Sequence, residues 1–163
     1  MPVEIYGDVN DKLKCRLGYA LIRGYGIEKD EVKGWELIKS SGWHIVFLKE
    51  RNVAEDYFQY RAAKDGYNDL DSYCDKLYEI DDDDSSFLFE YLLQRLGFDP
   101  EKDKEAIYDY YLKRANSGNA FSMAVVAVLE LQKNNIKEAE TWARRSKNKG
   151  SGLGKWIMTN QFQ

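Results

Sequence analysis

The side chains best suited to chemistry in this chain are a single histidine and two cysteines, and none stands in a catalytic or metal-binding pattern. No second histidine, HExxH motif or CxxC motif accompanies His44, so zinc binding and a histidine-based triad have little support. Cys74 has no histidine near it in sequence and no signature of a thiol nucleophile. We therefore expect no catalytic residue, no metal and no cofactor.

Four consecutive aspartates, Asp81, Asp82, Asp83 and Asp84, form the most conspicuous charge run. The run lacks the spaced acids, the central glycine and the terminal glutamate of a calcium loop. Such a run is typical of a solvated connector between helices, and contact with a basic partner is the alternative. Other carboxylate pairs lack an apolar context that would raise a pKa for general acid catalysis.

The overall charge points to a protein partner rather than a nucleic acid. The formal net charge of the 163-residue chain is −4, whereas nucleic-acid binding needs a basic face that displaces counterions. One local basic cluster closes a predicted helix, where the helix dipole favours cations; its members are Arg144, Arg145, Lys147, Lys149 and Lys155. The acidic balance is compatible with a cationic protein as partner.

The elements that must position these residues are helices joined by short turns. The stretch from Leu17 to Gly42 reads as a helix, a loop marked by Gly24 and Gly26, and a second helix that begins at the N-cap Asp30. Residues 1–10 are predicted to be a short irregular lead. The other predicted helices cover 43–64, with a break at Asn52, and 70–80, 87–96, 103–117, 120–132, 136–148 and 153–159.

This helical hairpin recurs along the chain. LIRGYGIEKDE at 21–31 returns as LQRLGFDPEKDK at 93–104, which places Asp30 and Asp103 in register at an offset of 73. YYLKRANSGNA at 110–120 matches WARRSKNKGSG at 142–152 at an offset of 32, about one helical-hairpin repeat. We expect Asp30 and Asp103 to occupy equivalent helix starts.

The pattern LGxxxxxGxGIxxDxxKG at 17–34 resembles the Sel1-like repeat, a relative of the tetratricopeptide hairpin. The matching residues are Leu17, Gly18, Gly24, Gly26, Ile27, Asp30 and Lys33, while Gly34 replaces the usual alanine. The family's later Lys-Ala-Ala-x-x-Gly has a counterpart at 113–118. The resemblance implies an adaptor or scaffold module; some small bacterial members of the family neutralise secreted toxins.

We therefore predict an all-α fold: one Sel1-like domain over 1–163, a short α-solenoid of about four stacked antiparallel helix hairpins. The hairpins are expected at roughly 11–42, 43–80, 85–118 and 119–150, followed by a capping helix at 152–160. No apolar run approaches the ~20 residues that cross a bilayer, and the first residues do not resemble a secretory signal. We expect a cytoplasmic protein with free Cys15 and Cys74; a periplasmic protein trimmed of its signal is the alternative.

The predicted function is protein binding without catalysis, as an immunity protein for a bacterial toxin or effector, with an adaptor or regulator as the alternative. An enzyme is the competing class. The binding face is expected on the first helix of each hairpin, within 12–23, 43–64, 87–96 and 120–132. Because tyrosine and arginine dominate binding hot spots and acids steer cationic partners, we predict contacts from Tyr57, Tyr60, Arg61, Asp81, Asp82, Asp83, Asp84, Tyr91 and Arg95.

Overall fold

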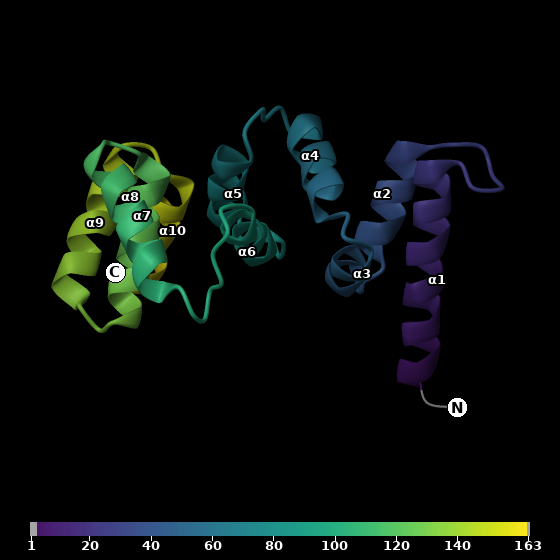
Figure 1. The fold of residues 1–163 in the computed structure, drawn as a ribbon, viewed down its shortest axis with the longest axis horizontal. Helices are drawn as coiled ribbons and strands as arrows, with labels where there is room; N and C mark the ends of the chain where they lie inside the picture. The colour runs from purple at the N-terminus through teal and green to yellow at the C-terminus, as the bar shows by residue number, and fades with distance from the viewer. Residues whose placement is uncertain (1–2, 163) are drawn as a thin grey trace. The chain divides into compact units, whose positions relative to one another are not determined.

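The chain is helical throughout the part that the structure describes. The computed structural model describes residues 3–162, with side chains from Asn10 onward, and these residues contain ten helices and no strand. The all-α class is thus as predicted (Figure 1). The helices are α1 Val3–Arg23, α2 Glu31–Ser40, α3 His44–Arg51, α4 Ala54–Lys64, α5 Leu70–Glu79, α6 Ser85–Arg95, α7 Lys104–Asn116, α8 Ala120–Gln132, α9 Ile136–Asn148 and α10 Gly152–Gln161.

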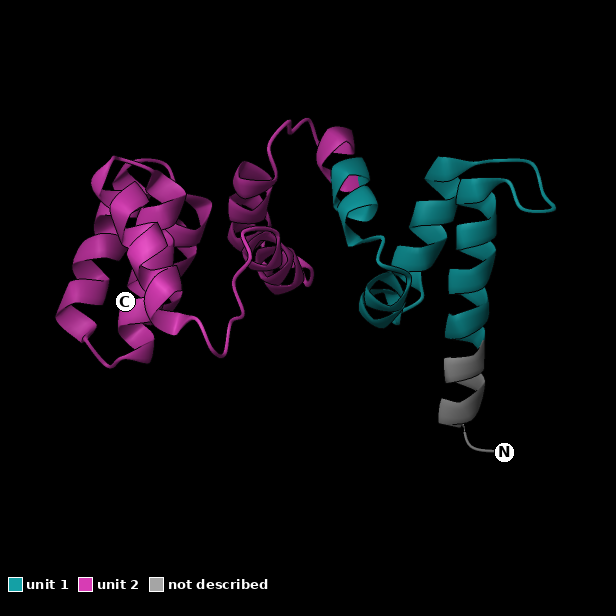
Figure 2. Ribbon diagram, viewed as in Figure 1, with its two compact units in different colours: residues 1–60 teal, residues 61–163 magenta. Residues whose placement is uncertain are grey.

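The chain divides into two compact units. Residues 1–60 form unit 1 and residues 61–163 form unit 2, so the division falls inside α4 (Figure 2). Unit 1 contains α1 to α3 and the first part of α4. Unit 2 contains the end of α4 and all later helices.

The two aspartates that the repeat offset places in register both start helices. Asp30 is the N-cap of α2, and its carboxylate accepts a hydrogen bond from the backbone N–H of Lys33 at 3.1 Å. Asp103 is the N-cap of α7, but its carboxylate accepts from the backbone N–H of Asp99 at 2.7 Å instead. Both residues are thus N-caps, but only the Asp30 side chain makes a capping hydrogen bond to its own helix. Between α1 and α2, Gly24 and Gly26 have φ of 73° and 68°, as the loop requires.

Two predicted helix starts are wrong. Of the expected irregular lead, residues 1–2 lie outside the described residues and the rest is helical from Val3. Once a helix exists, each further residue adds a hydrogen bond at little cost, so residues of low propensity can extend it. The helix predicted to begin at residue 87 begins at Ser85 instead, with Asp84 as its N-cap, whose backbone carbonyl accepts from Leu88 N–H.

Unit 1 is organised around a close crossing of α1 and α2. Both helices place a glycine at the crossing: a Cβ added to Gly18 would lie 2.6 Å from the Gly34 carbonyl oxygen, and one added to Gly34 would lie 2.6 Å from the Gly18 oxygen. Leu21 and Ile22 of α1 are buried, whereas Leu17, about one turn before Leu21, is 48% exposed. The face that α1 buries is therefore set by its glycine and not by its leucines alone.

We expect Gly34→Val to destabilise unit 1 by about 1–3 kcal/mol, because the new side chain would collide with the Gly18 backbone. Helix propensity favours valine over glycine, so a loss of stability identifies the collision as the cause. Thermal unfolding monitored by circular dichroism measures the effect. The matched control is Gly66→Val, where no atom lies within 4 Å of the added Cβ and only the strain of φ +85° applies. An unchanged melting temperature in Gly34→Val would show that the helices can separate freely.

Unit 2 closes through a contact between helices far apart in sequence. The carboxylate of Asp75 on α5 accepts hydrogen bonds from Ser151 Oγ at 2.7 Å, Gly152 N–H at 2.8 Å and Leu153 N–H at 3.0 Å, all at the start of α10. Besides α5, α10 packs on α8 and α9. The last helix thus covers the expected final hairpin and also joins it to α5.

The pairs of packed helices in unit 2 differ in part from the predicted hairpins. α8 packs against α9, and in unit 1 α1 packs against α2. The helices of each of these pairs lie within one hairpin of the predicted division. In addition, α5 packs against α6 and α7 against α8. The helices of these two further pairs belong to different hairpins in the predicted division.

Candidate functional site

A groove of about 840 Å³ lies in unit 2. α6, α7, α8 and α10 form its walls, with α5 and two connectors at its ends. Its lining is mostly apolar: Phe89, Leu93, Pro100, Ile107, Val125, Val128, Leu129, Leu153 and Trp156, with the aromatic ring of Tyr78. Of these, Phe89, Val128, Leu129 and Trp156 are half-buried, so apolar surface remains open to solvent.

The lining side chains lie in stripes along the helices. α8 contributes Val125, Val128, Leu129 and Gln132, the i, i+3, i+4, i+7 spacing of one helix face over two turns. α7 adds Lys104 and Ile107, and α10 adds Leu153 and Trp156, each pair at i, i+3. The groove is thus a space toward which several helices turn one face each.

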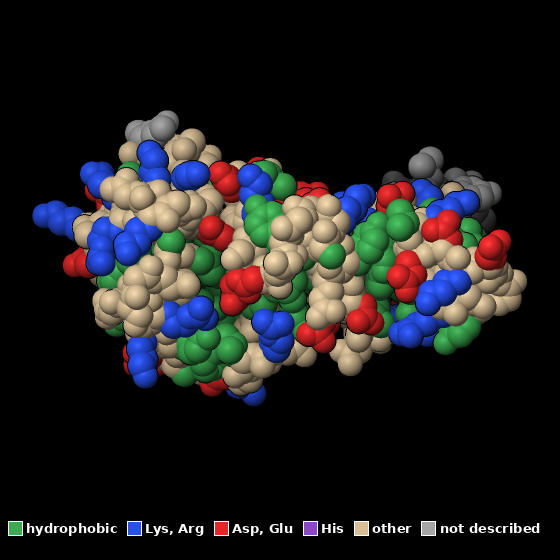
Figure 3. Space-filling model, turned by 90° about the horizontal axis from the view of Figure 1, so that it is seen from above, with side chains coloured by type: hydrophobic (Ala, Val, Ile, Leu, Met, Phe, Trp, Pro, Cys, Tyr) green, Lys and Arg blue, Asp and Glu red, His purple; other side chains and the backbone are tan. Residues whose placement is uncertain are grey.

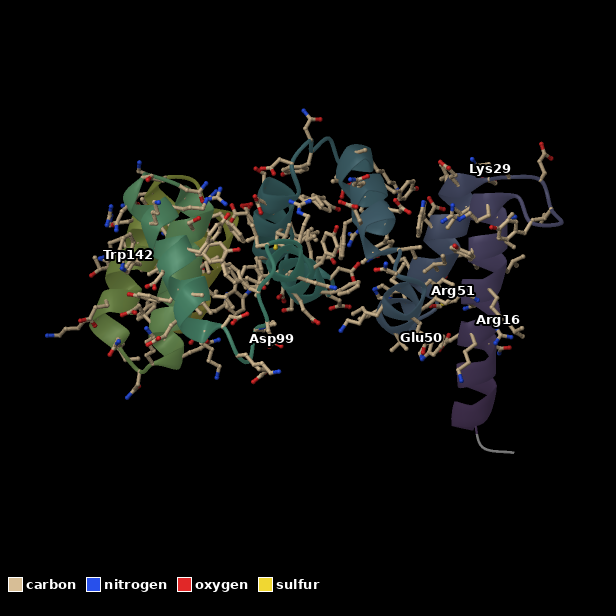
Figure 4. All side chains as sticks on the ribbon, in the orientation of Figure 1. Arg16, Lys29, Glu50, Arg51, Asp99 and Trp142 are labelled. Carbon is tan, nitrogen blue, oxygen red and sulfur yellow. The ribbon has the colours of Figure 1, made fainter. Side chains whose placement is uncertain are left out.

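The walls of the groove are built locally. The connector between α6 and α7 supplies Pro100 and Glu101, and Asp99, labelled in Figure 4, fixes its turn. The Asp99 carboxylate accepts from Glu101 N–H at 2.8 Å and from Lys102 N–H at 3.2 Å. These bonds hold the connector as a preformed edge rather than an open loop.

The charged groups of the groove are mainly acidic. Asp81, Glu90 and Glu101 contribute carboxylates, and Lys104 contributes one ammonium group. Tyr78 also lines the groove, and burial raises the pKa of its hydroxyl to about 12. The phenol therefore stays neutral at physiological pH and serves as a hydrogen-bonding group. The arrangement suits an occupant that is apolar along its length and positively charged at its edges.

The acidic run does not act as four free carboxylates. Arg61 forms a bidentate pair with Asp82, at 3.2 and 2.9 Å, and a further bond to Asp84 at 2.8 Å. The side chains of these residues are 13%, 15% and 0% exposed. Arg61, Asp82 and Asp84 are therefore an internal ion cluster, which corrects their prediction as partner contacts. Asp81 lies on the groove, and Asp83 is exposed and does not line it.

The predicted tyrosine contacts also separate. Tyr57 is 1% exposed and packs with Trp35, His44 and Phe58 in unit 1, so it belongs to the core and cannot touch a partner. Tyr60 is half-buried, with its ring 6.2 Å from that of Trp35. It lines a smaller cleft of about 520 Å³ in unit 1.

The remaining predicted pair lies on α6. Arg95 stacks on the ring of Tyr91 at 6.0 Å, so the two residues do share a helix face as their spacing predicted. Neither is among the residues that line the groove. Of the nine predicted site residues, Asp81 alone is in that lining, although α6 and α8 are two of the four helices predicted to form a binding face.

The cysteines and the basic cluster, which the sequence also singled out, lie outside the groove. Cys15 and Cys74 are buried free thiols, and burial raises the pKa of both. Among the described residues no group of three His, Cys, Asp or Glu side chains could hold a metal ion. In the basic cluster, Arg144 pairs with Glu140 at 2.7 Å, and Arg145 lies 4.5 Å from the ring centre of Trp142.

Lys and Arg side chains gather at the end of unit 2 that α9 occupies, at the left of Figure 3. Lys147 and Lys149 lie near the end of this helix. Trp142, labelled in Figure 4, is on the same helix and is half-buried. Four of the five cluster residues thus lie on α9 or at its C-cap, as the dipole argument expects, whereas Lys155 lies on α10 and pairs with Glu79 at 3.5 Å. The cluster lies outside the groove lining.

Sequence reasoning missed the groove, although α8 carries a signal for it. AFSMAVVAVLELQ has no charged residue before Glu130. A helix that is apolar on every side should be covered on every side, and α8 has Val128 and Leu129 half-exposed in the groove. An apolar helix that is only partly covered by other helices indicates a candidate binding surface on α8.

Comparisons of the chain with protein-family models, with curated proteins and with solved structures found no match. Among the described residues, none of the helices combines the length and apolar character of a membrane span.

Proposed function

We propose that this protein is a non-catalytic protein-binding module and that the groove of unit 2 is its binding surface. The observation that supports the proposal most is the open apolar lining: four half-buried apolar side chains from three helices face one cavity, and the cavity is bordered by carboxylates. Exposed, contiguous apolar surface rimmed by polar groups is typical of sites where proteins dock.

The lining favours binding over chemistry. Its polar members are the hydroxyls of Tyr78, Ser85 and Ser86, one amide, three carboxylates and one ammonium group. It contains no histidine or cysteine, and the raised pKa of Tyr78 makes that phenol a poor base at neutral pH. A docking surface accounts for the apolar residues, whereas an active site would leave most of them without a role.

The resemblance at 17–34 extends the proposal to a family. We propose that the helices form a degenerate Sel1-like solenoid, whose members are known for protein binding. An immunity protein that neutralises a cognate toxin fits a small acidic module of this kind, and an adaptor is the alternative. The gene next to this one separates the two, because a toxin-like reading frame favours immunity and a sensor or secretion regulator favours an adaptor.

Site-specific photocrosslinking tests the groove as the binding surface. We expect p-benzoylphenylalanine at Val128, irradiated in cells of the source organism, to give a discrete protein adduct. The matched position is Ile136 on α9, which is 48% exposed and outside the groove lining. The adduct at 128 should disappear when Trp156→Glu is added. No adduct at 128, or the same adduct at both positions, would contradict the proposal.

A further inference from the structure

Resting on the proposed function, a further question is what kind of segment the groove accepts. We propose that it accepts a single amphipathic α-helix of a partner protein, with apolar residues facing the groove and lysine or arginine at its edges. Helix-in-groove docking reads anchors at i, i+3 or i+4, and i+7, and the groove offers the complementary surface.

Four helices turn part of one face toward the groove. α8 faces the groove with Val125, Val128, Leu129 and Gln132, and α6 faces it with Ser85, Ser86, Phe89, Glu90 and Leu93. Both sets follow one helix face over about two turns, and shorter stripes of α7 and α10 face the same space. Faces of this kind normally bury themselves against another helix.

The dimensions suit a short helix. From Val125 to Gln132, α8 rises about 10.5 Å at 1.5 Å per residue, so the stripe is long enough for two turns of a bound helix and about three anchors. A cavity of about 840 Å³ lies in the range of sites that enclose several side chains. An occupant of two to four turns would cover the open faces of Val128, Leu129 and Trp156.

The charges along the groove favour a bound helix with basic residues. The lining has three carboxylates, from Asp81, Glu90 and Glu101, against the single ammonium group of Lys104. These carboxylates lie on exposed residues, whereas the apolar residues Leu93, Val125 and Leu153 are at most 5% exposed. The groove therefore has an apolar floor and an acidic edge, and a helix with basic flanks is its electrostatic complement.

Three synthetic 15-residue peptides test the inference on the full chain. The first has leucine at i, i+3, i+4 and i+7 with lysine at its flanks; the second replaces each lysine by glutamate; the third scrambles the first so that its leucines form no stripe. Fluorine NMR of 5-fluorotryptophan reports the site, because Trp156→Phe identifies the resonance of the residue in the groove. Trp35, Trp43 and Trp142 are absent from the groove lining and serve as internal references.

We expect the lysine peptide to shift the Trp156 resonance alone, with a Kd at least tenfold below those of the glutamate and scrambled peptides. Val128→Glu should raise the Kd at least tenfold, whereas Ile136→Glu, outside the groove, should not change it. In Glu90→Lys/Glu101→Lys the preference should reverse toward the glutamate peptide. Circular dichroism of each variant confirms that it is folded, and Leu129→Gln replaces Val128→Glu if that variant is not.

Four outcomes would overturn the inference. Equal binding of the lysine and scrambled peptides would show that the groove does not recognise a helical stripe of leucines. Unchanged selectivity after charge reversal would show that the acidic edge does not select the peptide. If the protein self-associates and Val128→Glu abolishes this self-association, the occupant of the groove is a second copy of the chain. If no peptide binds while the crosslink at 128 forms, the helix inference fails and the proposed function stands; if both are missing, the proposed function fails as well.

Discussion

Replacing Arg61 by alanine is expected to destabilise unit 2 by about 3–5 kcal/mol. The guanidinium makes three hydrogen bonds of 2.8–3.2 Å to Asp82 and Asp84. Asp84 is fully buried, so the substitution would remove a guanidinium that neutralises a carboxylate in the interior. Removing one member of such a pair costs far more than the pair contributes, because the remaining charge cannot be hydrated. Chemical denaturation monitored by circular dichroism measures the loss.

The exposed pair of Arg144 and Glu140 provides the matched control. Their distance of 2.7 Å resembles that of the buried pairs, but their side chains are 56% and 42% exposed. Arg144→Ala should therefore change stability by less than about 1 kcal/mol. Adding Asp82→Asn and Asp84→Asn to Arg61→Ala should recover part of the loss, since no uncompensated charge would remain. Equal effects of the two arginine substitutions would show that burial does not decide the energy of the cluster.

The second large effect is expected at Asp75, where alanine should cost about 3 kcal/mol. This carboxylate receives three hydrogen bonds from the first residues of α10. Bonds to a charged group contribute about 1.5–3 kcal/mol each before losses are shared among them, and the anion also faces the positive end of the helix dipole. Without it, Ser151 Oγ and two backbone N–H groups lose their acceptor.

Asp69 separates this tertiary contact from ordinary capping. It caps its own helix, α5, by accepting from Asp71 N–H and Ser72 N–H, so Asp69→Ala should cost about 1 kcal/mol. Hydrogen exchange distinguishes the two variants as well: Asp75→Ala should expose amides in both α5 and α10, and Asp69→Ala only those at the start of α5. The same loss in both variants would argue against a special role of the α5–α10 contact.

Much of the secondary structure follows from local chemistry and could be predicted. The turn after α2, the break at Asn52 and the helices from α7 to α9 lie where spacing and turn residues place them. Asn52 has φ 56° and ends α3, which matches the tolerance of asparagine for left-handed backbone. Such features depend on a few neighbouring residues and are therefore readable in one sequence.

Packing is where prediction from sequence ends. Tyr57 and Tyr60 have the same side chain three residues apart, yet the first is core and the second lines a cleft. An aspartate in a run of four reads as solvated, but Arg61 lies 21 residues before Asp82 and folds back on it. Helix periodicity shows which residues share a face; it does not show which other helix, if any, covers that face. The groove could not be predicted because it depends on which helix faces are left uncovered.

The contact between Asp75 and the start of α10 also limits when unit 2 can fold during synthesis on the ribosome. A ribosome adds about 5–20 residues per second, and the acceptor and its donors are 76 to 78 positions apart. The carboxylate is therefore made roughly 4–16 s before the amides that it binds. During synthesis α5 must wait with its side toward α10 uncovered, and unit 2 can close only after the last helix has left the exit tunnel.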